Sequence, residues 1–178
     1  APRAPGRAAA GRAPARAEDL LAEAAYWKAQ GNGHLQAGEV ERADELYSRG
    51  LEALQEEERD PGLARPLLGR IVRLRAELHN NQAEACLRLE EYETAADAAT
   101  AALHELQLPA SGSAGREAGE VKALFRRAKA LRALGRPQEA RADLLEALQL
   151  QPGNEAVRLQ LLHLDFADDF LGLDREQP

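Results

Sequence analysis

The chain has 178 residues with 4% aromatic and 30% charged side chains, a formal net charge of −7 at pH 7, and one cysteine, Cys86. This length suits one domain with its own core, and the abundance of Ala, Leu, Glu and Arg predicts an all-α fold. A single cysteine excludes an intramolecular disulfide and favours the cytoplasm or nucleus, and no apolar run approaches the ~20 residues of a membrane span.

Residues 1–17, APRAPGRAAAGRAPARA, hold four arginines and no acid, so the remainder of the chain carries a net charge of −11. Pro, Gly, Ala and Arg without hydrophobic periodicity cannot bury a core, which predicts a disordered linker or tail before a domain over 18–173. An Arg-rich start is also compatible with an organelle transit peptide, although this one lacks serine and an amphipathic pattern. The absence of methionine favours a fragment of a longer chain.

Three segments, about 24–57, 76–109 and 121–154, share small residues at matched positions. The first matched position is occupied by Gly31, Ala83 and Ala128, and the second, twelve residues later, by Ala43, Ala95 and Ala140. Small residues at this spacing let two antiparallel helices approach closely, so each segment is expected to form a helix pair. Gly31 would then be small because a second helix crosses there. A last helix over about 154–171 would cover the exposed face of the third pair.

Two inserts separate the three segments. The first has 18 residues and leads into apolar residues at helix spacing, so it is expected to extend the first helix of the second pair backwards. These residues are Leu67, Ile71, Leu74 and Leu78. The second insert, ASGSAGREAGE over 110–120, is small and polar and predicts a flexible loop.

The repeated pattern resembles the tetratricopeptide repeat, a helix-turn-helix unit of 34 residues that stacks into a right-handed superhelix. Trp27 stands at position four of the first unit, where this family often has tryptophan. The long connections resemble those of the large immunophilins of the FK506-binding-protein type and of the aryl-hydrocarbon-receptor-interacting protein. In such a fold the first helix of each pair lines a concave groove.

Five polar residues are expected to project into that groove. Lys28 and Asn32 are four residues apart, as are Lys122 and Arg126, so each pair lies on one helix face, and Asn81 comes from the middle repeat. Ammonium and guanidinium groups make charge-assisted hydrogen bonds to carboxylates, and asparagine donates without adding charge. The set can therefore hold two carboxylates at once.

These stretches, KAQGN, LHNNQAEA and KALFR, are similar to the carboxylate clamp of co-chaperone repeats, with its Lys-x-x-x-Asn, Asn and Lys-x-x-x-Arg pattern. The resemblance implies that Lys28, Asn32 and Asn81 hold the terminal carboxylate of a heat-shock protein 90 or 70 tail ending Glu-Glu-Val-Asp. Lys122 and Arg126 would hold neighbouring acidic groups. The implied role is that of a co-chaperone or adaptor.

A solvated helix face is the ordinary interpretation of such charges. Arginine supplies 20 of the 23 basic residues, however, and two of the three lysines stand at the clamp's lysine positions. No cofactor or metal site is predicted, because the four histidines are scattered and one cysteine gives no metal-ligand spacing. The acidic domain without interleaved aromatic residues also argues against nucleic acid.

Catalysis finds no support in these residues, so an isomerase or other enzymatic domain would lie outside this sequence. The competing interpretation is a scaffold that binds an internal peptide or a client protein without reading a free C-terminus. The acidic and apolar stretch LDFADDFLGLD, over 164–174, is one candidate surface for a client.

Overall fold

The computed structural model describes residues 12–55, 64–113 and 115–173, and within them the chain forms seven α-helices, one short 3₁₀ helix and no strand. In chain order they are α1 (Arg12–Ala37), α2 (Val40–Ala53), α3 (Arg65–Arg88), α4 (Tyr92–Gln107), η2 (Pro109–Ser111), α5 (Arg116–Ala133), α6 (Pro137–Leu150) and α7 (Glu155–Leu173). The predicted all-α class is confirmed.

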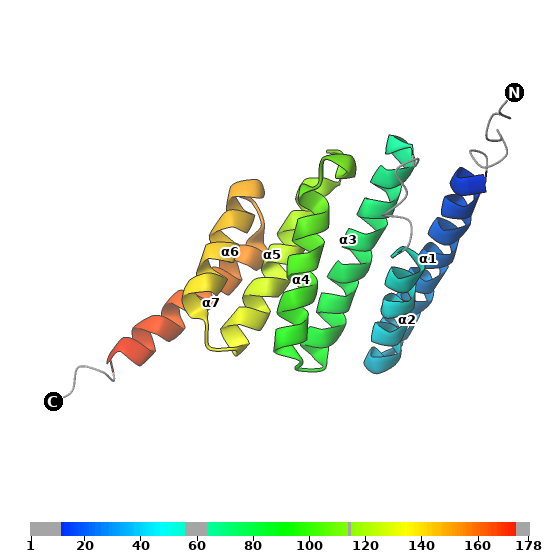
Figure 1. Ribbon diagram of the computed structural model, residues 1–178. Helices are drawn as coiled ribbons and strands as arrows, with labels where there is room; N and C mark the ends of the chain where they lie inside the picture. The colour runs from blue at the N-terminus through cyan, green and yellow to red at the C-terminus, as the bar shows by residue number, and fades with distance from the viewer. Residues whose placement is uncertain (1–11, 56–63, 114, 174–178) are drawn as a thin grey trace, which may run out of the picture.

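The helices lie side by side in chain order, with α1 at one end of the array and α7 at the other (Figure 1). They pack as the pairs α1 with α2, α3 with α4, and α5 with α6, while α3 also contacts α1 and α5. The last helix packs on α6 and buries Val157 and Leu164 in a cluster with Leu144. Each such side chain contributes about 1.5–3 kcal/mol when fully buried. Three helix pairs and a C-terminal covering helix were predicted and are confirmed.

The three pairs close with the same kind of turn. Gly38, Glu90 and Gly135 have positive φ angles of 83°, 61° and 72°, and each lies seven residues after the small residue of its own repeat. Glycine adopts this left-handed conformation freely, whereas Glu90 does so at a cost of about 1–2 kcal/mol. The turns therefore keep the register of the repeat even where the favoured residue is missing.

Gly31 marks the point where α2 crosses α1. A Cβ atom at this position would lie 2.5 Å from Cε1 of Tyr47, which is far inside van der Waals contact. Tyr47 is fully buried beside Leu21 and Leu78 and cannot retreat without disturbing that cluster. Gly33, two residues further on, has no neighbouring atom within 4 Å of the equivalent point. Only the first of these glycines is required for packing, in agreement with the sequence prediction.

The first insert extends α3 as expected. This helix begins at Arg65, and the four apolar residues that predicted the extension are all buried. They are Leu67, Ile71, Leu74 and Leu78. The extension therefore adds a further apolar stretch to the core formed with α1 and α2.

The second insert is more ordered than the predicted flexible loop. Its first residues belong to η2, and α5 already begins at Arg116. The Ser111 hydroxyl is buried and donates to the carbonyl oxygen of Leu106 at 2.8 Å. A Cβ on Gly69 would lie 2.5 Å from the carbonyl oxygen of Ala110, so this glycine in α3 lets the connection pack closely. Small residues here serve close packing rather than freedom of movement.

The helical array begins earlier than predicted. α1 starts at Arg12, and Ala17 is fully buried in the cluster that contains Leu21 and Leu67. Alanine and arginine are strong helix formers, and Pro14 falls in the first turn, where backbone N–H groups have no intrahelical partner. The predicted boundary at residue 18 is therefore corrected, since 12–17 are helical. Residues 1–11 of the predicted tail lie outside the described residues.

Alanine substitutions at the two glycines of α1 should have opposite effects. Gly31→Ala places a methyl group against the Tyr47 ring and should lower the free energy of unfolding by about 1–3 kcal/mol, the usual cost of overpacking. Gly33→Ala gains helix propensity without a clash and should raise the free energy of unfolding by about 0.5–1 kcal/mol. Urea denaturation of both variants measures the two changes. Shifts of the same sign would contradict this account of the crossing.

Candidate functional site

All five predicted site residues line one cavity of about 320 Å³. The cavity lies between α1, which supplies Lys28 and Asn32, α3, which supplies Asn81, and α5, which supplies Lys122 and Arg126. Its other lining residues are Glu77, Asn80, Gly115, Ala118 and Gly119. Residues that lie almost a hundred positions apart in the sequence therefore share one surface, as the repeat register predicted.

Two asparagines and a tyrosine form a chain of hydrogen bonds across three helices. Asn32 Oδ1 accepts from the Tyr47 hydroxyl of α2 and from Asn81 Nδ2 of α3, each at 2.9 Å. Burial raises the pKa of Tyr47, which keeps the hydroxyl protonated as a donor. Because the oxygen of Asn32 is used internally, the amide nitrogen of this residue is the group that is left to donate to a ligand.

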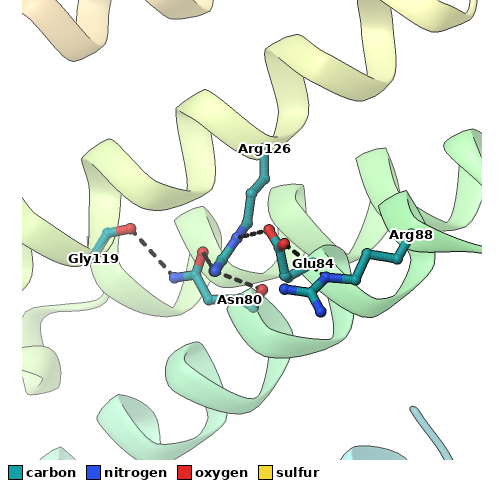
Figure 2. A network of polar contacts seen from close by, with 5 residues as sticks. All are labelled: Asn80, Glu84, Arg88, Gly119 and Arg126. Carbon is teal, nitrogen blue, oxygen red and sulfur yellow. Dashed lines mark hydrogen bonds and ion pairs between the residues drawn. The ribbon is translucent and has the colours of Figure 1, made fainter. Parts of the chain in front are cut away.

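Arg126 connects α5 to α3. Its Nη1 donates to the backbone oxygen of Asn80 at 2.7 Å, and its Nε to Glu84 Oε2 at 3.3 Å (Figure 2). The other oxygen of Glu84 accepts from Arg88 Nε at 3.2 Å. Burial lowers the pKa of Arg126 and Glu84 opposes this shift, so the guanidinium, whose side chain is 17% exposed, stays charged at neutral pH.

Asn80 strengthens the same junction. Its side chain is buried, and Nδ2 donates to the backbone oxygen of Gly119 at 3.3 Å (Figure 2). Its Oδ1 accepts from Arg126 Nη1 at 3.4 Å. The pair Asn80 and Asn81 is recognisable in the sequence, because asparagine is a poor helix former, but only Asn81 was predicted to belong to the site.

The two lysines of the cavity have different surroundings. Lys28 Nζ forms an ion pair with the carboxylate of Glu77, and these side chains are 25% and 58% exposed. Lys122 is exposed, and within the described part of the chain its ammonium has no ion pair. The site residues predicted from the sequence did not include Glu77, Glu84 or Tyr47. The spacing of the two acids about one turn either side of Asn81 puts them near its helix face, but many acids satisfy such a rule.

The cavity is locally cationic within an acidic chain. Three cations and one carboxylate line it, whereas the whole chain has a net charge of −7. Charge-assisted donors and fixed amides in a partly enclosed groove suit a ligand that presents more than one carboxylate. The described residues contain no group of three metal-ligating side chains, and none of the described helices combines the length and apolar character of a bilayer span.

A larger cavity, of about 650 Å³, lies elsewhere, between the start of α3 and η2. Its walls are mostly apolar, with Leu68, Val72 and Leu108 among them, and it includes none of the five predicted residues. By size alone, this larger cavity would be the candidate ligand site. The smaller one is the better candidate because its polar groups converge from three helices.

Comparison with known families and proteins points to one class of domain. A family model described as a tetratricopeptide repeat matches residues 121–154, the same limits as the third predicted repeat. Protein unc-45 homolog B of Mus musculus is 28% identical over 144 residues, which are 81% of this chain and 13% of that protein. The chain thus spans only 12–13% of the length of such curated relatives.

Solved structures share the fold. The second TPR domain of human RPAP3, in complex with the HSP70 peptide SGPTIEEVD, is 29% identical with a TM-score of 0.61 and covers 82% of this chain and 98% of that one. The first TPR of Spaghetti (RPAP3), bound to the HSP90 peptide SRMEEVD, is 25% identical with a TM-score of 0.61, covering 82% and 94%. The C-terminal TPR-containing domain of a Plasmodium falciparum FK506-binding protein is 22% identical with a TM-score of 0.71, covering 90% and 96%, and this likeness concerns the fold.

Cys86 should be chemically inert in the folded protein. It is fully buried, and burial, together with the nearby Asp44 carboxylate, raises the pKa of its thiol to about 12. At pH 8 only about one thiol in ten thousand would be ionised. We expect iodoacetamide to leave the native protein unmodified over a period that labels it fully in guanidinium chloride, as followed by mass spectrometry. Equal labelling rates in the two conditions would show that this site is open.

Proposed function

We propose that this chain, a tetratricopeptide-repeat domain, is a protein-interaction module that binds the C-terminal Glu-Glu-Val-Asp tail of heat-shock protein 90 or 70. The observation that carries this proposal is the convergence of three cations and two asparagines on one cavity. The two RPAP3 domains with bound chaperone peptides support it, because they share the fold at 25–29% identity. The role is that of a co-chaperone or adaptor rather than an enzyme.

The contacts suggest that two sets of cavity residues bind two different parts of the peptide. Lys28 and the amide nitrogens of Asn32 and Asn81 would hold the terminal main-chain carboxylate, because fixed donors from two helices meet there. Lys122 and Arg126, across the cavity on α5, would bind acidic groups further from the peptide end. A hydrogen bond to a charged group contributes about 1.5–3 kcal/mol, so three or four such contacts supply about 5–12 kcal/mol, part of which offsets the cost of ordering the peptide.

A second candidate function is a scaffold for a client protein. Leu159, Leu162 and Phe166 of α7 are about half or more exposed, which leaves apolar area free at the end of the array. Such a partner would not require a free C-terminus. The state of the peptide end therefore separates the two functions.

A free peptide end should be essential for binding. Calorimetry with SRMEEVD and SGPTIEEVD should give micromolar dissociation constants, and amidation of either C-terminus should weaken binding at least about tenfold, because it removes the charge that Lys28 and the asparagines would hold. Raising the salt concentration should also weaken binding, since the cavity is open to solvent. Equal affinity for free and amidated peptides would favour the scaffold instead.

Lys122 offers the cleanest test of a single contact. Lys122→Ala should weaken binding of the free peptide by about tenfold to a hundredfold, corresponding to ~1.5–3 kcal/mol. Arg132→Ala is the matched control, because Arg132 is an exposed cation on the same helix outside the cavity. Arg126→Ala is less informative, because it also removes one of the two arginines that pair with Glu84 and the side-chain donor to the Asn80 carbonyl. If Lys122→Ala and Arg132→Ala behave alike, the assignment of the cavity is wrong.

Tyr47→Phe should show whether the Tyr47 hydroxyl orients the site, because it should weaken peptide binding without affecting folding. The ring remains in the core, but Asn32 loses one of its two internal hydrogen bonds, so its amide can rotate away from the ligand. We expect binding to weaken about threefold to tenfold, within the ~0.5–1.5 kcal/mol of a neutral hydrogen bond, with little change in melting temperature. Tyr92→Phe, on α4 and outside the cavity, serves as the control. Unchanged peptide binding would show that Tyr47 does not orient the site.

A further inference from the structure

The cavity contains an acid of its own at the position where a ligand carboxylate is expected. Glu77 of α3 lines the cavity and its carboxylate is paired with Lys28 Nζ of α1. Lys28 is also the cation closest in the chain to Asn32, whose amide completes that end of the site. A carboxylate from another molecule can reach Lys28 only by displacing Glu77 or by sharing the ammonium with it.

Glu77 is held weakly enough to be displaced. Its side chain is 58% exposed, and ion pairs between exposed groups contribute only about 0–1 kcal/mol. One turn earlier on the same helix face, Arg73 borders the same small surface hollow as Glu77, so a released carboxylate has another cation within reach. Water can also solvate it directly.

The second acid of the groove behaves differently. Glu84 is 25% exposed and bridges Arg88 and Arg126 (Figure 2). It is not among the residues that line the cavity. Releasing it would leave a largely buried guanidinium without its carboxylate, which is costly. Glu84 is therefore a fixed part of the groove wall, and Glu77 is the acid that can exchange.

We propose that Glu77 is an intramolecular competitor that occupies Lys28 in the free protein and is expelled when a peptide carboxylate binds. This inference rests on the proposed function and adds a residue that sets its affinity. Because binding exchanges one ion pair for another, the parent protein gains less from the Lys28 contact than a groove without Glu77 would. The same exchange makes the affinity of the parent less dependent on salt.

Removing the charge of Glu77 should therefore strengthen binding. In calorimetry with free-ended SRMEEVD, Glu77→Gln should bind about threefold to tenfold tighter than the parent, and its affinity should fall more steeply with salt. Glu93→Gln is the matched control, because Glu93 is an exposed acid on α4 outside the cavity. In a Lys28→Ala background the gain from Glu77→Gln should shrink below about twofold, since the competitor then has no target.

The ion pair can also be observed without a ligand. The chain has three lysines, so acetylation rates by an N-hydroxysuccinimide ester can be followed for each by peptide mapping. Lys28 should react more slowly than Lys122 in the parent, and Glu77→Gln should raise its rate while leaving Lys122 unchanged. Equal rates for Lys28 and Lys122 in the parent would overturn the inference.

The outcomes distinguish this inference from the proposed function. If the parent binds the free peptide and Glu77→Gln binds equally or more weakly, Glu77 is not a competitor and the proposed function stands. A gain that persists undiminished without Lys28 also overturns the inference, because it reflects the general field of the acid. If neither the parent nor Glu77→Gln binds any free-ended peptide, the proposed function fails and the competitor role fails with it.

Discussion

The close crossing of α1 and α2 at Gly31 is the constraint on which the groove depends. The Tyr47 ring occupies the volume that a side chain at residue 31 would need. Its hydroxyl therefore lies 2.9 Å from Oδ1 of Asn32, the next residue of α1. Asn32 in turn accepts from Asn81 of α3. One packing contact thereby aligns three helices and fixes the direction of a polar group that faces the cavity. The same packing contact therefore stabilises the core and determines the geometry of the site.

Arg126 has the corresponding role between α3 and α5, but it acts through charge. A guanidinium that is only 17% exposed is tolerated because Glu84 and the Asn80 carbonyl satisfy it, and removing one member of a buried pair typically costs about 3–5 kcal/mol. Lys122 has no such partner among the described residues, and Lys28 has an exchangeable one. The cavity thus has a wall built from hydrogen-bonded Arg126 and the asparagines, together with an ion-paired Lys28 and an exposed Lys122. Preorganised donors beside adaptable cations suit a short peptide end.

The periodic parts of the structure were predictable from the sequence. Small residues twelve positions apart predicted the helix pairs, and apolar spacing from Leu67 predicted the extension of α3. The prediction failed at the start of α1, where residues 12–17 continue the Pro-, Ala- and Arg-rich composition of the tail and therefore read as a linker, although buried Ala17 makes them part of the core. Glu77 and Glu84 could not be predicted from the sequence for another reason. Many acids share a helix face with a predicted site residue, and only tertiary contacts show that Glu77 reaches Lys28 and Glu84 reaches Arg126.

The balance of charges bears on how an acidic tail could be recognised at all. The chain has a net charge of −7, so at long range it repels a ligand with several carboxylates, and attraction begins only within about a Debye length, roughly 8 Å at physiological salt, of the cations in the cavity. Association would then proceed without long-range electrostatic steering, at the slower rates typical of unsteered encounters. Discrimination would have to come from contacts made after entry, where the fixed amide and guanidinium N–H groups donate to a carboxylate in one orientation. A net negative chain with a cationic cavity therefore favours recognition through short-range contacts over capture by long-range attraction.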